Sequence, residues 1–187
     1  MSAKTTLAKV GGVVALALVT AAIPSAAFAN NTVGTATLTG GALSLVTPAA
    51  VGFSATLTGS DQTVPATQAI DVVDGTGSAS GWNVTLTSTQ FATGGSNLPV
   101  NSVSDQGAIG SCDTGVTCTL ADNSATSYPI AVPAGTVAPT AVRIMSAASG
   151  TGMGAQSWTH NMVLAIGGNA TAGTYNSTWT YSLVSGP

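Results

Sequence analysis

Charge is what this sequence has least of. Charged residues occupy 5% of its 187 positions, and the six acidic ones are all aspartate. Two of the three basic residues, Lys4 and Lys9, lie near the N-terminus, so Arg143 is the one cation in the rest of the chain. Phosphate contacts need a basic patch, which this composition does not supply. The sequence therefore predicts no nucleic-acid partner.

The chain also has little that acid–base catalysis needs. Glutamate is absent, and His160 is the single histidine. A Ser-His-Asp triad would have to use His160, but the sequence contains no GxSxG nucleophile elbow. His160 alternates with Trp158 and Met162, which is typical of a strand and predicts a side chain packed at a sheet surface. We therefore predict that the protein is not an enzyme, and we expect no cofactor.

The aspartates do not form a clear metal-binding pattern. Asp71 and Asp74 flank a Gly-rich turn, where aspartate most often hydrogen-bonds its own backbone. A cation-binding role for Asp71, Asp74 or Asp105 is the alternative, but no spacing in the sequence requires it. We predict no metal site.

The N-terminus has the organisation of a secretory signal peptide. Two lysines precede an apolar stretch at residues 10–23, and Ala27 and Ala29 occupy the small-residue positions of a cleavage site. Cleavage after Ala29 leaves an exported chain of residues 30–187. No second apolar run approaches the length of a membrane span, and no LPxTG-like sorting motif is present. We expect an exported protein, attached to the cell surface without a covalent tether.

The two cysteines, Cys112 and Cys118, are close in sequence. In an exported chain such an even pair predicts a disulfide. The alternating pattern weakens over residues 101–123, so we expect the disulfide to sit on an irregular, Gly-rich insertion.

Helix formers are scarce, whereas Thr and Val, which favour strands, are abundant. Turn signals recur about every ten residues, a spacing typical of all-β sandwiches and barrels. We predict a single antiparallel β-sandwich domain over residues 30–187. The expected strands are residues 32–38, 42–46, 51–57, 64–73, a strand that begins at Trp82, and residues 128–132, 142–146, 157–166 and 174–184.

Two motifs stand out within these strands. The first is a Gly-rich turn at residues 74–77, followed by Gly81, Trp82 and Val84. The second runs from AGTY at residues 172–175 to Pro187. Its further positions are Tyr181, Leu183 and Pro187. In a strand, Tyr175, Trp179, Tyr181 and Leu183 face the same way.

On these two motifs the chain resembles the WxL family of Gram-positive bacteria. Tyr181 stands where the family has tryptophan in its second motif, and Val84 stands for leucine in the first. The resemblance covers about residues 32–187. It implies a cell-surface protein whose domain attaches non-covalently to the wall, with peptidoglycan as the partner.

Trp82, Trp179 and Tyr181 are the candidate ligand-binding residues. Large aromatic side chains dominate a small β core, which is one interpretation of all three. The other is a glycan-binding platform, where aromatic faces stack on sugar rings and Asn and Thr side chains form hydrogen bonds. An alternative function is a structural subunit that assembles with itself or another surface protein, because a charge-poor edge strand invites pairing.

Overall fold

The computed structural model describes residues 32–186. The predicted signal peptide and Pro187 lie outside the described residues. All described strands fall within one compact unit, Leu38–Pro187, and residues 32–37 form no strand. Within residues 32–186 there is no helix long and apolar enough to cross a membrane.

The first sheet is antiparallel throughout, with strand order β1-β2-β8-β4-β5. Its strands are β1 (Leu43–Val46), β2 (Gln62–Asp74), β8 (Gly154–Ile166), β4 (Val103–Cys112) and β5 (Ile130–Ala131). β2 and β8 pair without a break along their full length, and this ladder forms the middle of the sheet.

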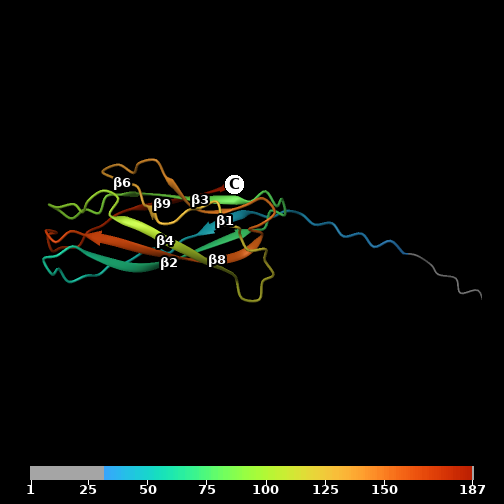
Figure 1. Ribbon diagram of the computed structural model, residues 1–187. Coiled ribbons are helices and arrows are strands. Elements are labelled where there is room, and N and C mark those ends of the chain that lie inside the picture. The colour runs from blue at the N-terminus through green and yellow to red at the C-terminus, as the bar shows by residue number, and fades with distance from the viewer. Residues whose placement is uncertain (1–31, 187) are drawn as a thin grey trace, which may run out of the picture. The chain divides into compact units, whose positions relative to one another are not determined.

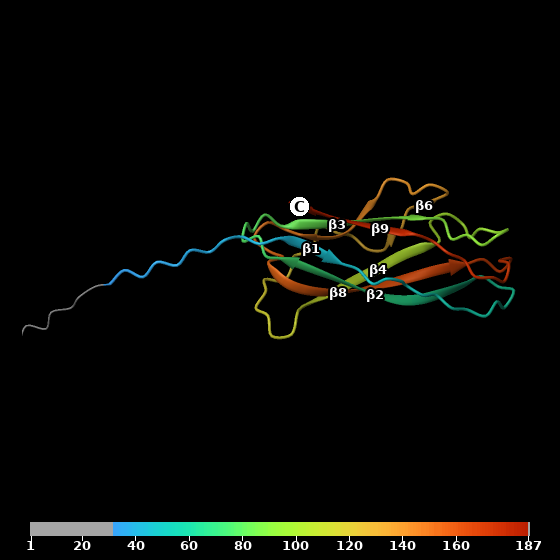
Figure 2. The ribbon, with the colours of Figure 1, turned by 180° about the vertical axis from the view of Figure 1, so that it is seen from behind.

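The second sheet is built around β3 (Trp82–Thr89). On one edge β3 pairs antiparallel with β9 (Trp179–Ser185). On the other edge it pairs antiparallel with β7 (Val142–Ala147) and parallel with the short β6 (Ala134–Gly135). Figures 1 and 2 show β2, β4 and β8 in one layer and β3, β6 and β9 in the other. The predicted all-β sandwich is therefore confirmed.

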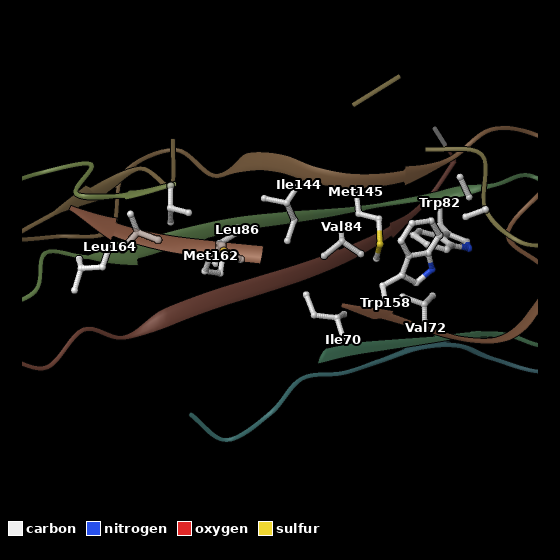
Figure 3. Close-up of a cluster of buried hydrophobic side chains, with 14 of the residues drawn as sticks. Ile70, Val72, Trp82, Val84, Leu86, Ile144, Met145, Trp158, Met162 and Leu164 are labelled. Carbon is white, nitrogen blue, oxygen red and sulfur yellow. The ribbon is translucent and has the colours of Figure 1, made fainter. Parts of the chain in front are cut away.

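The core lies between the two layers and follows from the alternation along each strand. In β3 every second side chain, from Trp82 to Ser88, is buried. The largest buried side chains come from both sheets (Figure 3): Ile70, Val72, Trp158, Met162 and Leu164 from the first, and Trp82, Val84, Leu86, Ile144 and Met145 from the second. Burying this apolar layer is the main favourable contribution to folding.

The prediction of an irregular insertion over residues 101–123 is wrong in its first half. Residues 103–112 form β4, which lies between β8 and β5 in the first sheet. The register shifts between Asp105 and Ala108, where Gly107 has a positive φ of 150°. This bulge adds a residue to one strand and breaks the period-two pattern, which is why the sequence pattern weakened there.

Two other predicted strands, residues 32–38 and 51–57, are not strands in the structure. β1 pairs with β2 only as far as Val46, and Pro48 follows shortly after. Proline has no N–H to donate to a ladder, so pairing stops there and residues 47–57 leave the edge of β2. Gly40 and Gly41, between the predicted strands at residues 32–38 and 42–46, therefore do not form a hairpin turn. Gly41 instead donates to the carbonyl of Gly75 at 2.7 Å.

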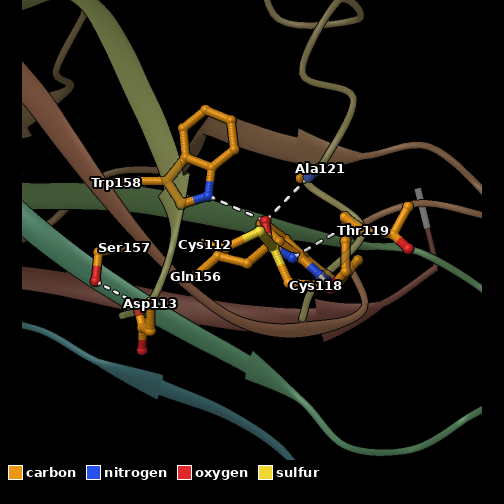
Figure 4. The surroundings of a disulfide bond; sticks show 10 residues. Cys112, Asp113, Cys118, Thr119, Ala121, Gln156, Ser157 and Trp158 are labelled. Atoms are coloured by element: carbon orange, nitrogen blue, oxygen red, sulfur yellow. Dashed lines mark hydrogen bonds between the residues drawn. A yellow bond between two sulfur atoms is a disulfide. The ribbon is translucent and has the colours of Figure 1, made fainter. Parts of the chain in front are cut away.

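The disulfide between Cys112 and Cys118 is confirmed. It joins the end of β4 to a segment that is tied into the sandwich (Figure 4). The amide of Thr119 donates to the carbonyl of Met153 at 2.9 Å, and the amide of Gly152 donates to the carbonyl of Thr119 at 2.8 Å. The amide of Ala121 donates to the buried side chain of Gln156 at 2.9 Å. The disulfide therefore braces one end of the sandwich.

Replacing both cysteines with serine should lower the free energy of unfolding by about 2 kcal/mol, the entropy expected for so short a closed loop. Urea unfolding of the oxidised wild type and of Cys112→Ser/Cys118→Ser measures the difference. Equal stability of the two proteins would contradict the bracing role.

Replacing Trp82 with alanine should cost ~3–5 kcal/mol, because its side chain is 0% exposed and leaves a cavity. Trp179→Ala is the matched control and should cost clearly less, since Trp179 is only partly buried. Urea unfolding followed by circular dichroism compares the two variants. Similar losses for both would show that Trp179 is also a core residue.

Candidate functional site

Trp82 lies inside the sandwich and not at a surface site. Its indole N–H donates to the carbonyl of Gly152 at 2.9 Å. Gly81, just before it, has a φ of +76°, and a side chain there would collide with the carbonyl of Ala147. Gly81 therefore permits the close approach that seats Trp82. Trp82 has no exposed face for a ligand, so Trp179 and Tyr181 alone remain candidates.

Trp179 and Tyr181 line a groove of about 390 Å³ between the two sheets. One wall is formed by residues 47–51, which follow β1, and the other by residues 175–179 and Tyr181. Gln68 and Phe91 complete the lining, and none of the lining residues is charged. Aromatic rings, hydroxyl groups and amides thus face one hollow without a nearby ion.

The aromatic side chains of this groove are held by contacts from distant segments. The ring of Phe53 lies 6.4 Å from that of Trp179 and meets the ring of Phe91 edge-on at 6.1 Å. Tyr181 donates its hydroxyl hydrogen to the Gln68 side chain at 2.5 Å and thereby links β9 to β2 of the other sheet. These contacts restrict the rotamers of both candidates, and rings restricted in this way lose little entropy on binding.

Phe53 lines a second hollow, of about 590 Å³. This hollow is lined mainly by residues 51–57 and 170–175, together with apolar side chains such as Leu98 and Ile166. Tyr175 lines both hollows, and its hydroxyl donates to the carbonyl of Thr171 at 2.8 Å. Residues 47–51 thus line the groove, and residues 51–57 line the second hollow.

His160 lies in β8 and is fully buried in the sandwich. Its Nδ1 lies 2.6 Å from Oδ2 of Asp105, and both side chains are 0% exposed. His160 faces Gln68 across the β2–β8 ladder. Its Nε2 has no hydrogen-bond partner within residues 32–186. No serine hydroxyl contacts that nitrogen, so these residues do not form a Ser-His-Asp triad.

The aspartates considered for cation binding are dispersed. Asp74 ends β2 and accepts hydrogen bonds from the amide and hydroxyl of Thr76, at 2.9 and 2.7 Å. This is the own-backbone interaction expected of aspartate beside a Gly-rich turn. Asp71 lies within β2, and Asp105 pairs with His160. Within residues 32–186 no three His, Cys, Asp or Glu side chains are grouped as metal ligands.

The remaining motif residues serve packing. Val84 is fully buried, and Leu183 packs against the core from β9. The sequence missed Gln68, Phe53, Phe91 and residues 47–51, because only the fold brings them next to β9. The common parity of Tyr175, Trp179 and Tyr181 was the one available signal, and these residues do share the groove.

Comparison with known proteins identifies no relative: no family model, no curated protein and no solved structure matches this chain. The WxL resemblance therefore stays a prediction that rests on the two motifs.

Two partly buried tyrosines should make stability fall at high pH. Burial raises the pKa of Tyr128 to about 12 and also raises the pKa of Tyr181. In the unfolded chain both titrate near the ordinary value of about 10. The folded state thus favours the protonated form, so this stability is fully present below about pH 10 and is lost as pH rises towards 12.

Between pH 8 and pH 11, the urea concentration at the unfolding midpoint should therefore fall more for wild type than for Tyr181→Phe. The variant lacks the Tyr181 hydroxyl and keeps only that of Tyr128 in this pair. The tyrosinate absorbance of Tyr128 and Tyr181 should appear at the same pH at which the protein unfolds. Complete ionisation in the folded protein below pH 10.5, well under the raised values, would contradict this assignment.

Proposed function

We propose that this is an exported, non-catalytic protein that attaches without a covalent bond to the glycan of the bacterial cell wall. The observation that carries the proposal is the uncharged groove at Trp179 and Tyr181. Partly exposed aromatic rings beside hydroxyl and amide groups suit a sugar, which offers apolar ring faces and many hydroxyl groups. The predicted signal peptide and the motif resemblance agree with a surface location.

Electrostatics favour peptidoglycan over anionic wall polymers as the ligand. Beyond the predicted signal peptide, one arginine stands against six aspartates, a net charge of 1 − 6 = −5. Teichoic polymers are anionic and would repel such a chain at low salt. Binding must then rest on stacking, shape and hydrogen bonds, for which the groove provides Trp179, Tyr181 and Asn176.

Wild-type protein should sediment with purified Gram-positive sacculi, and Trp179→Ala should raise the dissociation constant by up to about tenfold, the loss of one good stacking contact. Thr180→Ala is the matched control: Thr180 lies on the same strand, but its exposed side chain points away from the groove. Binding should change little between low and moderate salt, because no ion lines the groove.

Thermal melts of each variant separate lost binding from lost folding. Equal binding by wild type and by folded Trp179→Ala would remove the groove from the proposal. Loss of binding with a chelator would instead indicate a cation bridged by aspartates. Failure of the folded wild type to sediment, with migration as a large assembly, would favour the alternative function of a structural subunit.

A further inference from the structure

Among the described residues, 32–186, β9 has backbone hydrogen-bond partners on one of its two edges. Its ladder with β3 runs without interruption from Ser88↔Trp179 to Trp82↔Ser185. Just beyond the two ends, Thr89 donates to the carbonyl of Thr178, and Gly186 donates to the carbonyl of Gly81, both at 2.9 Å.

These flanking bonds determine towards which edge the backbone N–H and C=O groups of each β9 residue point. In an antiparallel ladder, successive residues direct their N–H and C=O groups to opposite edges. The backbone groups of even-numbered residues, such as Thr178 and Gly186, therefore point towards β3. The odd-numbered ones face the other edge: Trp179, Tyr181, Leu183 and Ser185. Their backbone groups have no hydrogen-bond partner within residues 32–186.

The other sheet edges are protected by devices that β9 lacks. β1 is only four residues long. Where β1 no longer pairs with β2, β2 itself forms the edge of the sheet, and this part of β2 contains Pro65. The open edge of β4 has the bulge between Asp105 and Ala108. Short edge strands, proline and bulges all discourage pairing with another chain.

β7 is protected by a covering segment. The amide of Ser146 donates to the Asn123 side chain at 2.8 Å, and the Arg143 guanidinium donates to the carbonyl of Ala125 at 2.9 Å. β9, by contrast, contains no charge, no proline and no bulge. Residues 47–51 face the side chains of Trp179 and Tyr181 across the groove, but no backbone hydrogen bond joins them to β9. An edge whose backbone groups are unpaired and that has these properties is a template for strand addition.

We propose that two copies of this chain pair through their β9 strands, antiparallel and about a two-fold axis at Ser182. This register overlaps the whole strand, with Trp179 opposite Ser185 and Tyr181 opposite Leu183 of the second copy. Each of these pairs joins two residues whose free backbone groups face each other, so each exchanges two hydrogen bonds. The second sheet of one copy then joins the second sheet of the other copy to form one continuous sheet.

A second copy fits this edge because the strand is complementary to itself. On the outer face, Thr180 lies opposite Val184 of the other copy, and Ser182 lies opposite its own equivalent. Val184 is 53% exposed in the single chain and is covered by this contact. Each copy carries a net negative charge, but none of it lies on β9, so the contact itself brings no like charges together.

Analytical ultracentrifugation of the exported form should show a dimer whose share rises with concentration. Ser182→Lys places two ammonium groups directly opposite each other across the two-fold axis. The dissociation constant should then rise at least about tenfold, since like charges opposite one another and a lysine on an edge both oppose pairing. Asn161→Lys is the matched control and should dimerise as wild type does, because Asn161 is equally exposed but lies on the outer face of β8.

Hydrogen exchange identifies the contact itself. The amides of Trp179, Tyr181, Leu183 and Ser185 should exchange more slowly as the protein concentration rises, and those of Ser182 and Val184 should not change. A wild type that remains monomeric at about 1 mM would overturn the proposal. So would equal dimerisation of the two lysine variants, or protection of the odd-numbered amides that does not depend on concentration.

Sedimentation with sacculi measures wall binding separately from dimerisation. Ser182 is exposed and is not among the residues that line the groove, so Ser182→Lys should still sediment with sacculi as wild type does. Loss of the dimer in a variant that retains wall binding supports the β9 contact, whereas loss of both would show that the substitution disturbs β9 itself and would overturn this assignment of the dimer.

Discussion

The burial of Trp82 is the contact on which most of the sandwich depends. Its indole fills the space between the sheets near Trp158 and Val72 (Figure 3), and its N–H satisfies the carbonyl of Gly152. Gly152 in turn donates to Thr119, next to the disulfide. One end of the core is thus closed by a chain of contacts that runs from β3 through the loop before β8 to the end of β4. A cavity at Trp82 would loosen each of these segments.

Low charge determines how the polar groups of this protein are satisfied. Within residues 32–186 the one close carboxylate–imidazole contact is between Asp105 and His160, at the centre of the sandwich. Many hydroxyl and amide groups elsewhere bond backbone atoms or each other, as Tyr181 does with Gln68 and Ser146 with Asn123. The same chemistry appears at the groove beside β9, where rings and hydroxyl groups meet without ions. A surface of this kind suits a neutral polymer.

β9 takes part in both proposed interactions, through different sides. Its inward side chains, Trp179, Tyr181 and Leu183, pack towards the groove and the core. The backbone groups of these same residues point along the plane of the sheet, where no partner meets them. In the two proposals, glycan binding uses the side chains of β9 and pairing with a second copy uses its main chain. We therefore expect the two interactions to respond to different substitutions.

Composition and local pattern determined the fold class. Scarce helix formers, abundant Thr and Val and regular turn signals led to an all-β sandwich, and the paired cysteines led to the disulfide. Period-two alternation located the long strands β2, β3 and β8, because a strand with one buried face repeats every second residue. It did not locate β4, since a bulge interrupts that repeat.

Only the tertiary structure decided which aromatic residues are core and which line the groove. Trp82 and Trp179 have similar local sequences, each in an alternating strand, but β3 is covered on both edges and β9 is not. Exposure depends on what the other sheet and residues 47–57 place over each strand, and these contacts join residues far apart in the chain. A local pattern records the face of a strand. It carries no information on the neighbours that cover that face or pair with that edge.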